Sequence, residues 1–292
     1  MIVATAAYPL DFLTSWTQYE DKLARWVEEA VTGGADLLVF PEYGAMELAT
    51  LAGSEIAGDL EASLFAVSDR LDDANAFHQH LAETHNVHIL AASAPAATEE
   101  RPVNRARLFT PDGAVGVQDK QIMTRFERDV WRVQGGGPLQ IFDTVLGRIG
   151  VLICYDAEFP LLGRALSECD LLLVPSCTEA LSGYWRVRIG AMARALENQC
   201  VAVMSSLVGE APWSEAVDVS TGCGGVFGPP DAGFPPTGVI AEGKLNQPGW
   251  TFAEVDLNVI AHVRKDGRVL GRLHWSEQIG RDAAAPVVKL RR

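Results

Sequence analysis

Apolar residues along this chain alternate between short continuous runs and helical periodicity. Residues 2–7 form the first run, and the near-continuous run at 35–40 is typical of a strand covered on both faces. Between them, apolar residues recur at steps of three and four, which predicts one buried face of a helix. Ser15 and Gln18 predict a capping box at its start, and Gly33 supplies its C-terminal stop.

The alternation continues through the chain and predicts helices at 72–85, 158–168 and 183–197. Apolar runs predict strands at 87–93, 147–154, 170–175 and 200–206, and shorter strands near 225–227, 238–241 and 251–256. The turn Pro111-Asp112-Gly113 predicts a hairpin between two further strands. Helices between strands, together with hairpins, favour a mixed α/β sheet, and because no linker or repeat interrupts residues 1–292 we expect a single domain.

Composition narrows the function classes. Of 292 residues 48% are hydrophobic and 21% charged, as in a globular protein with a sizeable core. The formal net charge of −14 repels phosphate backbones, which argues against a nucleic-acid partner. No apolar run approaches the roughly 20 residues of a membrane span, so no membrane partner is expected. The N-terminus lacks a cationic region and favours a strand over a signal peptide.

Cysteine and histidine spacing argues against a metal site. The five cysteines are an odd number without a CxxC pair, which favours reduced thiols in a cytoplasmic protein. The histidine cluster misses the HExxH pattern of zinc enzymes. The members of that cluster are His78, His80, His85 and His88. We therefore expect neither a metal nor an organic cofactor.

Three predicted strands end in polar residues that their apolar context does not require. Glu42 follows the run at 35–40, Lys120 closes a strand of the hairpin, and Cys154 ends the strand at 147–154. Sites of α/β folds lie at the carboxyl ends of strands. Each residue alone also fits a structural interpretation: a solvated loop glutamate, a surface turn or a buried cysteine. Glu127, within a charged segment after Lys120, fits a surface turn equally well.

Taken together, in this order, the three residues resemble the Glu-Lys-Cys triad of the nitrilase superfamily. The similar segments are FPEYG around Glu42, DK at Lys120 and GVLICYDAEFP around Cys154, with DLLLVPS, ARALENQC, GFPPTGVIAEG and FAEVDL in support. MTRFERDVW at 123–131 is similar to a bacterial branch in which some members carry an added acetyltransferase domain. Tyr155 after the cysteine is similar to the amidase-type members, whereas nitrilases usually carry Trp there.

The resemblance implies a four-layer αββα sandwich that assembles into homodimers or larger homo-oligomers, with the tail at about 258–292 at an interface. It implies that Cys154 is the nucleophile, Glu42 the general base and Lys120 an oxyanion-stabilising cation beside the backbone N–H of Tyr155. Glu127 would help to position the lysine. Substrate contacts are expected from Tyr43, Asp156, Cys177 and Thr178. For Trp185, Trp213 and Phe234, core packing is a better explanation than a place in the acyl pocket.

The resulting hypothesis is hydrolysis of a small carboxylic amide through a Cys154 thioester, because a carboxylate can take the thiol proton and a nearby cation favours the thiolate. A nitrilase or a hydrolase of N-carbamoyl amines would use the same three residues. A non-catalytic binding protein of the same fold and a papain-like Cys–His enzyme are the alternatives from other classes. The substrate itself is not encoded in these motifs.

Overall fold

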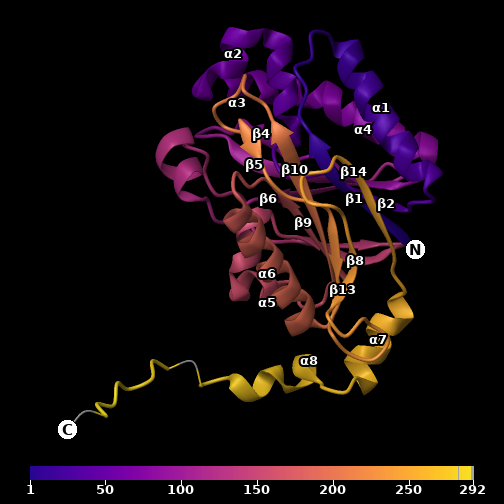
Figure 1. The fold of residues 1–292 in the computed structure, drawn as a ribbon, viewed down its shortest axis with the longest axis vertical. Coiled ribbons are helices and arrows are strands. Elements are labelled where there is room, and N and C mark those ends of the chain that lie inside the picture. Colours follow the sequence, from indigo (N-terminus) through magenta and orange to yellow (C-terminus); the bar gives the residue numbers. More distant parts are fainter. Residues whose placement is uncertain (282, 291–292) are drawn as a thin grey trace.

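The computed structural model describes residues 1–281 and 283–290, in which strands and helices alternate (Figure 1). The strands are β1 (Ile2–Pro9), β2 (Leu37–Val39), β3 (His88–Leu90), β4 (Ala94–Ala96), β5 (Val103–Phe109), β6 (Val115–Asp119), β7 (Ile141–Thr144), β8 (Gly147–Val151), β9 (Leu171–Ser176), β10 (Val201–Glu210), β11 (Val219–Ser220), β12 (Gly225–Phe227), β13 (Val239–Glu242) and β14 (Gly249–Glu254). The α-helices are α1 (Trp16–Thr32), α2 (Ser54–Gly58), α3 (Leu60–Ser68), α4 (Leu71–His85), α5 (Pro160–Ala165), α6 (Leu181–Asn198), α7 (Leu257–Asp266) and α8 (Gly271–His274). Tighter or wider helical turns occupy Gly44–Ala52, Glu127–Trp131, Cys154–Glu158 and Trp275–Gln278.

Strand β1 connects two halves of one curled sheet. Its residues 3–5 pair with β2 and residues 2–7 with β14, while residues 7–9 pair with β10. One half therefore contains β6, β5, β3, β2, β1 and β14 in spatial order, and the other contains β7, β8, β9, β10, β12 and β13. In each half the central strands are parallel, so the chain leaves them at a common edge.

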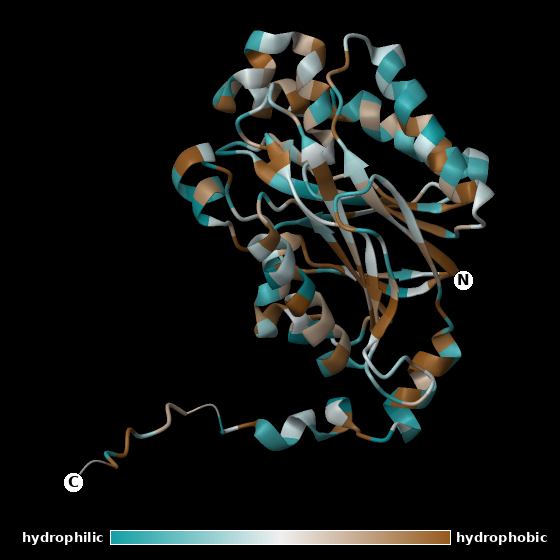
Figure 2. Ribbon diagram, in the orientation of Figure 1, coloured by the Kyte–Doolittle hydropathy of each residue, from teal (hydrophilic) through white to brown (hydrophobic). Residues whose placement is uncertain are grey.

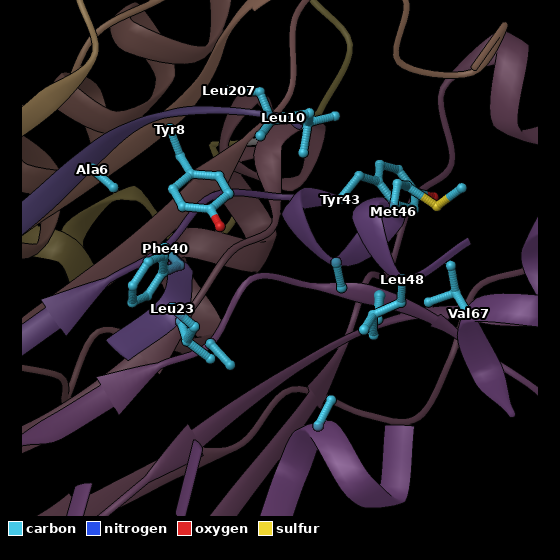
Figure 3. Packing of buried hydrophobic residues seen from close by; sticks show 14 of the residues in the cluster. Ala6, Tyr8, Leu10, Leu23, Phe40, Tyr43, Met46, Leu48, Val67 and Leu207 are labelled. Atoms are coloured by element: carbon cyan, nitrogen blue, oxygen red, sulfur yellow. The ribbon is translucent and has the colours of Figure 1, made fainter. Parts of the chain in front are cut away.

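The two halves pack face to face because successive residues of a strand point to opposite faces. In β2, Leu37 belongs to the core between the halves, which also contains Leu171 and Val201 of the second half. The next residue, Leu38, belongs to the outer core together with Leu23 of α1. In Figure 3, Leu23 lies near the Phe40 ring, which packs against Tyr8. Helices α1 and α4 cover the first half and α5 and α6 the second, which confirms the four-layer αββα arrangement (Figure 1).

Hydropathy follows these layers: brown, hydrophobic residues concentrate in the strands and teal residues on the outer helices (Figure 2). The Ser15 cap is confirmed, since its side chain accepts a hydrogen bond from the Gln18 N–H. The Gln18 side chain, however, bonds to Thr14 rather than back to Ser15. The hairpin around Asp112 is also confirmed, by the antiparallel pairing of β5 with β6.

Other predictions differ from the structure at the ends of elements. The strand expected at 147–154 ends at Val151, so Cys154 begins a 3₁₀ turn instead of closing the strand. The helices between 44 and 68 have no counterpart in the predicted pattern.

The tail expected at 258–292 includes α7 and α8, while residues 282, 291 and 292 lie outside the described residues. Within the described part, no helix has both the length and the apolar character needed to cross a membrane.

Candidate active site

One cavity of about 390 Å³ lies at the common edge of the strands and brings the predicted residues together. Glu42 follows β2, Lys120 follows β6 directly, and Cys154 lies three residues beyond β8. All three line the cavity together with Glu127. Residues up to 112 positions apart in sequence thus meet because their strands end at one edge of the fold.

Glu42 is 1% exposed and its carboxylate is fully hydrogen-bonded. Oε1 accepts bonds from Lys120 Nζ at 2.6 Å and Asn104 Nδ2 at 2.9 Å, and Oε2 accepts one from the Cys177 backbone N–H at 3.0 Å. Burial raises the pKa of Glu42 to about 7, with Lys120 opposing the rise and the charge of Glu127 adding to it. A carboxylate with this pKa can take up and release a proton near neutral pH.

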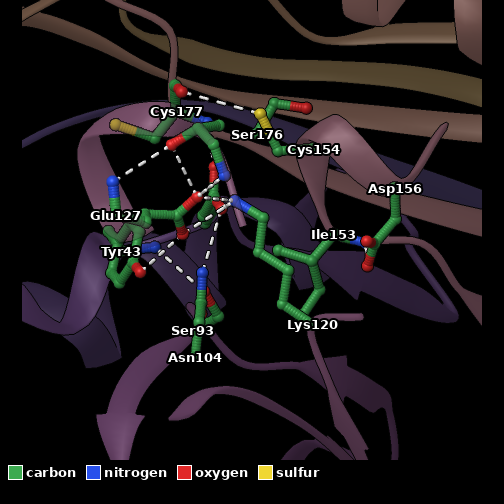
Figure 4. Close-up of polar contacts among 12 residues, drawn as sticks. Tyr43, Ser93, Asn104, Lys120, Glu127, Ile153, Cys154, Asp156, Ser176 and Cys177 are labelled. Atoms are coloured by element: carbon green, nitrogen blue, oxygen red, sulfur yellow. Dashed lines mark hydrogen bonds and ion pairs between the residues drawn. The ribbon is translucent and has the colours of Figure 1, made fainter. Parts of the chain in front are cut away.

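Lys120 lies at the centre of the polar network in Figure 4. Its Nζ donates to Glu42 and also to both carboxylate oxygens of Glu127, at 2.8 and 2.7 Å. Burial alone would lower the pKa of this ammonium, but the two glutamates outweigh it and hold the pKa well above its usual value. Lys120 is therefore a fixed cation in the cavity.

Glu127 is buried, in contrast to the surface turn that its charged neighbours suggest. Its Oε1 accepts a bond from the Tyr43 hydroxyl at 2.8 Å, and its Oε2 accepts bonds from the backbone and hydroxyl of Thr124. Burial would raise its pKa, but Lys120 and these donors lower it, so Glu127 stays ionised. Glu127 and Lys120 thus form a buried ion pair.

Cys154 has a left-handed backbone conformation with φ of 51°, which is uncommon for a residue with a side chain. Burial raises the pKa of its thiol well above the usual value, and Glu42 adds to the rise more than Lys120 opposes it. The thiol therefore keeps its proton at rest and needs a base. Among the described residues, no protein acceptor takes the backbone N–H of Tyr155, the residue next to it.

The other residues expected at the substrate differ in their positions. Tyr43, Cys177 and Thr178 line the cavity. Asp156 does not: its carboxylate points away from the network in Figure 4 and accepts bonds from the backbone N–H groups of Gln121, Ile122 and Ile153. Its role is to tie the segment after Lys120 to the turn that carries Cys154, because a buried carboxylate needs such donors.

Asn104 is a site residue that the sequence motifs did not reveal. It is fully buried in β5, and besides its bond to Glu42 its backbone C=O accepts the Lys120 N–H at 2.8 Å. A polar residue at an inward position of the strand VNRARLF was the only signal for it. Arg194 and Glu197 form an ion pair on α6, with 2.9 Å between Arg194 Nε and Glu197 Oε2.

In the described part of the chain, the histidine side chains lie outside the cavity lining. No group of three or more histidine, cysteine, aspartate or glutamate side chains there could hold a metal ion. A Cys–His mechanism would require a histidine beside the nucleophile, and the cavity lining contains none. His78 instead stacks on Phe109 and bonds to the Ala74 carbonyl within its own helix.

A four-layer αββα fold with a buried carboxylate, ammonium and thiol at one sheet edge is the arrangement that the resemblance to the nitrilase superfamily implies. The chain matches the carbon–nitrogen hydrolase family over residues 3–265. It therefore belongs to the carbon–nitrogen hydrolase family, whose members are enzymes.

Curated relatives agree with this family. The chain is 31% identical over 269 residues to the probable hydrolase YhcX of Bacillus subtilis, covering 91% of this chain and 52% of that protein. It is 30% identical to the omega-amidase YafV of Escherichia coli, covering 62% and 65%. It is 34% identical to an (R)-stereoselective amidase of Pseudomonas, covering 61% of each. The chain thus spans about half to two thirds of the length of these relatives.

Solved structures share the fold. A carbon–nitrogen hydrolase from Helicobacter pylori aligns with a TM-score of 0.73 at 17% identity, covering 91% of this chain and 92% of the other. A double mutant of the amidase from Nesterenkonia sp. in complex with acrylamide aligns with a TM-score of 0.66 at 21% identity, covering 95% and 97%. These similarities confirm the nitrilase-type architecture.

Proposed function

We propose that the protein hydrolyses a small carboxylic amide to the acid and ammonia through a thioester on Cys154. The observation that carries this proposal is Glu42, a buried carboxylate with a pKa of about 7 beside a protonated thiol and a fixed ammonium. Nucleophile, base and cation are the three groups that acyl transfer requires. The names of two relatives, an omega-amidase and a stereoselective amidase, support an amide over a nitrile.

In the acylation half-reaction, ionised Glu42 takes the proton of the Cys154 thiol as the sulfur attacks the amide carbon. The negative charge that develops on the carbonyl oxygen is stabilised by the Lys120 ammonium and the free N–H of Tyr155. Donors of this kind contribute roughly 10²–10³ each in rate. Glu42 then gives its proton to the nitrogen, the C–N bond breaks, and ammonia leaves a thioester behind.

In the deacylation half-reaction, Glu42 is again ionised and takes a proton from a water molecule that attacks the thioester carbon. The same two donors stabilise the second tetrahedral intermediate. The C–S bond then breaks, the sulfur recovers the proton from Glu42, and the carboxylic acid leaves. Lys120 keeps its proton throughout, because both glutamates hold its pKa high.

Hydroxylamine trapping tests the thioester directly. With a short aliphatic amide and hydroxylamine, we expect a hydroxamic acid, and rapid-quench intact-mass analysis of the original protein should show an acyl adduct. Cys154→Ala, which lacks the nucleophile, and Glu42→Gln, which lacks the base for acylation, should show no adduct. Cys200→Ala, which changes a cysteine outside the cavity lining, should keep the adduct. Folded protein that yields neither product nor adduct from amides, nitriles and N-carbamoyl amines would favour a binding protein instead.

A nitrile or an N-carbamoyl amine enters the same comparison as an alternative substrate. The two candidates share the three catalytic groups and differ in the group bonded to the attacked carbon. Ammonia release from matched amide, nitrile and N-carbamoyl compounds therefore separates them. We expect kcat/KM to be highest for the amide, and a nitrile that is hydrolysed faster would replace amidase by nitrilase activity.

A further inference from the structure

A second cavity of about 420 Å³ adjoins the catalytic one. Glu215, Asp218 and Val219 line both cavities, so the two cavities are neighbours. We call the second cavity the outer groove. Its full lining is Gly58, Glu210, Pro212, Trp213, Glu215, Asp218 and Val219. Glu215 and Asp218 therefore line the cavity of Cys154 as well as this groove.

One wall of the outer groove is the loop between β10 and β11, and it is firmly anchored. Ala211 and Val217 are 2% and 3% exposed and belong to the core beneath the first half of the sheet. The Ala211 N–H donates to the Asp218 carbonyl at 2.7 Å and closes the loop. Trp213 packs edge-on against Phe12. The groups on this loop thus have defined positions.

The charges around the two cavities are strongly unbalanced outside the catalytic residues. Five carboxylates line them, whereas one guanidinium, that of Arg186, does so. The carboxylates are Glu158, Glu179, Glu210, Glu215 and Asp218. The whole chain has 38 acidic and 24 basic residues, so the ratio of acidic to basic residues around the cavities far exceeds that of the chain. Arg186 is moreover paired with Glu158 at 3.3 Å, which leaves the other four carboxylates in excess.

We propose that the substrate amide carries a cationic group, a primary ammonium or a guanidinium, which the outer groove binds. This inference rests on the proposed amide hydrolysis: because ammonia is the leaving group, the cation belongs to the acyl chain. Glu215 and Asp218 supply the opposite charge where the cavities meet, and the Trp213 ring supplies a face for a cation–π contact. An anionic acyl chain would instead meet the excess carboxylates.

A charge series of amides tests this specificity. The probes are ω-amino amides of four to six carbons, alkanamides of the same length and the monoamides of the corresponding dicarboxylic acids. We expect kcat/KM for the ammonium compounds to exceed that of the neutral ones by about tenfold, as a few exposed charge contacts and one cation–π contact allow. The ratio should shrink at high salt, which screens exposed charges.

Substitutions in the groove locate the effect. The double variant Glu215→Gln/Asp218→Asn should reduce the ratio of ammonium to neutral amide severalfold, and Trp213→Leu should reduce it less. Glu28→Gln removes an exposed carboxylate on α1, outside both cavity linings, and should leave the ratio at its original value. Equal or higher kcat/KM for neutral or anionic amides in the original protein would overturn the proposal.

Binding without turnover separates this proposal from the proposed function. In Cys154→Ala, calorimetric titration should show tighter binding of 6-aminohexanamide than of hexanamide, and the groove double variant should abolish the difference. If the original protein does not hydrolyse the amides but Cys154→Ala still binds the ammonium compound more tightly, amide hydrolysis is refuted and the cation site stands. Hydrolysis of amides without any charge preference in binding or turnover would refute the cation site and keep the amidase.

Discussion

Glu127→Gln removes one of the two negative charges that flank Lys120 and keeps the size of the side chain. In the protein the charge of Glu127 raises the pKa of Glu42, so its removal should lower that pKa below about 7. The change also leaves Lys120 with one anionic partner, which strengthens its attraction for the Glu42 carboxylate. Both effects act in the same direction, because each stabilises ionised Glu42.

The size of the shift follows from the geometry around Nζ. One oxygen of Glu42 lies 2.6 Å and one of Glu127 2.7 Å from this atom. The two carboxylates are therefore at most about 5 Å apart, and at an effective dielectric constant of about 20 their repulsion is about 3 kcal/mol, or about 2 pH units. Rearrangement of Lys120 absorbs part of this energy, so we expect the pKa to fall by about 1–2 units.

The pH dependence of kcat/KM for a short amide, from pH 4.5 to 9, measures this shift. Glu42 must be ionised to act as a base, so activity should appear as pH rises through its pKa, near 7 in the original protein. In Glu127→Gln the midpoint should move down while the plateau falls, because Lys120 is less firmly held. Glu61→Gln, which removes an exposed partner of Arg101, is the control. An unmoved or higher midpoint in Glu127→Gln would refute this electrostatic reasoning.

Three further changes probe the scaffold. Gly190→Ala would place a Cβ 2.7 Å from the Ala157 carbonyl oxygen. Urea denaturation should therefore show that the free energy of unfolding falls by about 1–3 kcal/mol, instead of the increase that is usual for this change within a helix. Gly271→Ala, whose Cβ meets open space, is the control. Tyr43→Phe removes the buried bond to Glu127 and should cost about 1.5–3 kcal/mol in the same assay; a cost near zero would mean that this bond contributes nothing. We also propose a homodimer through the exposed apolar face of α6. Light scattering should give twice the chain mass for the original protein and the mass of a monomer for Ile189→Asp. A monomeric original protein would exclude this interface. That face consists of Leu181, Trp185, Ile189 and Leu196.

The sequence reveals those parts of the fold that depend on local patterns. Continuous apolar runs predict β1, β9 and β10, because buried parallel strands need apolar residues on both faces. The helices in the segment 44–68 were not predicted, because the first helical turn follows Tyr43 in a left-handed conformation. The burial of Glu47 is explained by distant partners: the Lys22 ammonium, the Tyr8 hydroxyl and the Asp11 backbone N–H. Such long-range pairing leaves no periodic signal.

The same distinction applies to the site. Glu42, Lys120 and Cys154 could be predicted because each follows a recognisable strand and because their order and flanking segments resemble those of a known family. The burial of Glu127 could not, since its sequence neighbours Arg125 and Arg128 are exposed and its partner Tyr43 is 84 residues away. The outer groove depends on how the loop after β10 folds, and no motif marks it.

The contacts of the three buried carboxylates predicted for the site explain which of them we propose as the base. Glu127 accepts bonds from Lys120, Tyr43 and Thr124, and these donors lower its pKa, so it has little tendency to take a proton. Asp156 has a pKa of about 6, raised by burial, but its oxygens are directed at backbone N–H groups away from the cavity. Glu42 combines a pKa of about 7 with a place in the cavity beside the thiol. Neighbouring carboxylates take different roles when their surroundings shift their pKa values by different amounts. Here Glu42 is the carboxylate that can exchange a proton with Cys154.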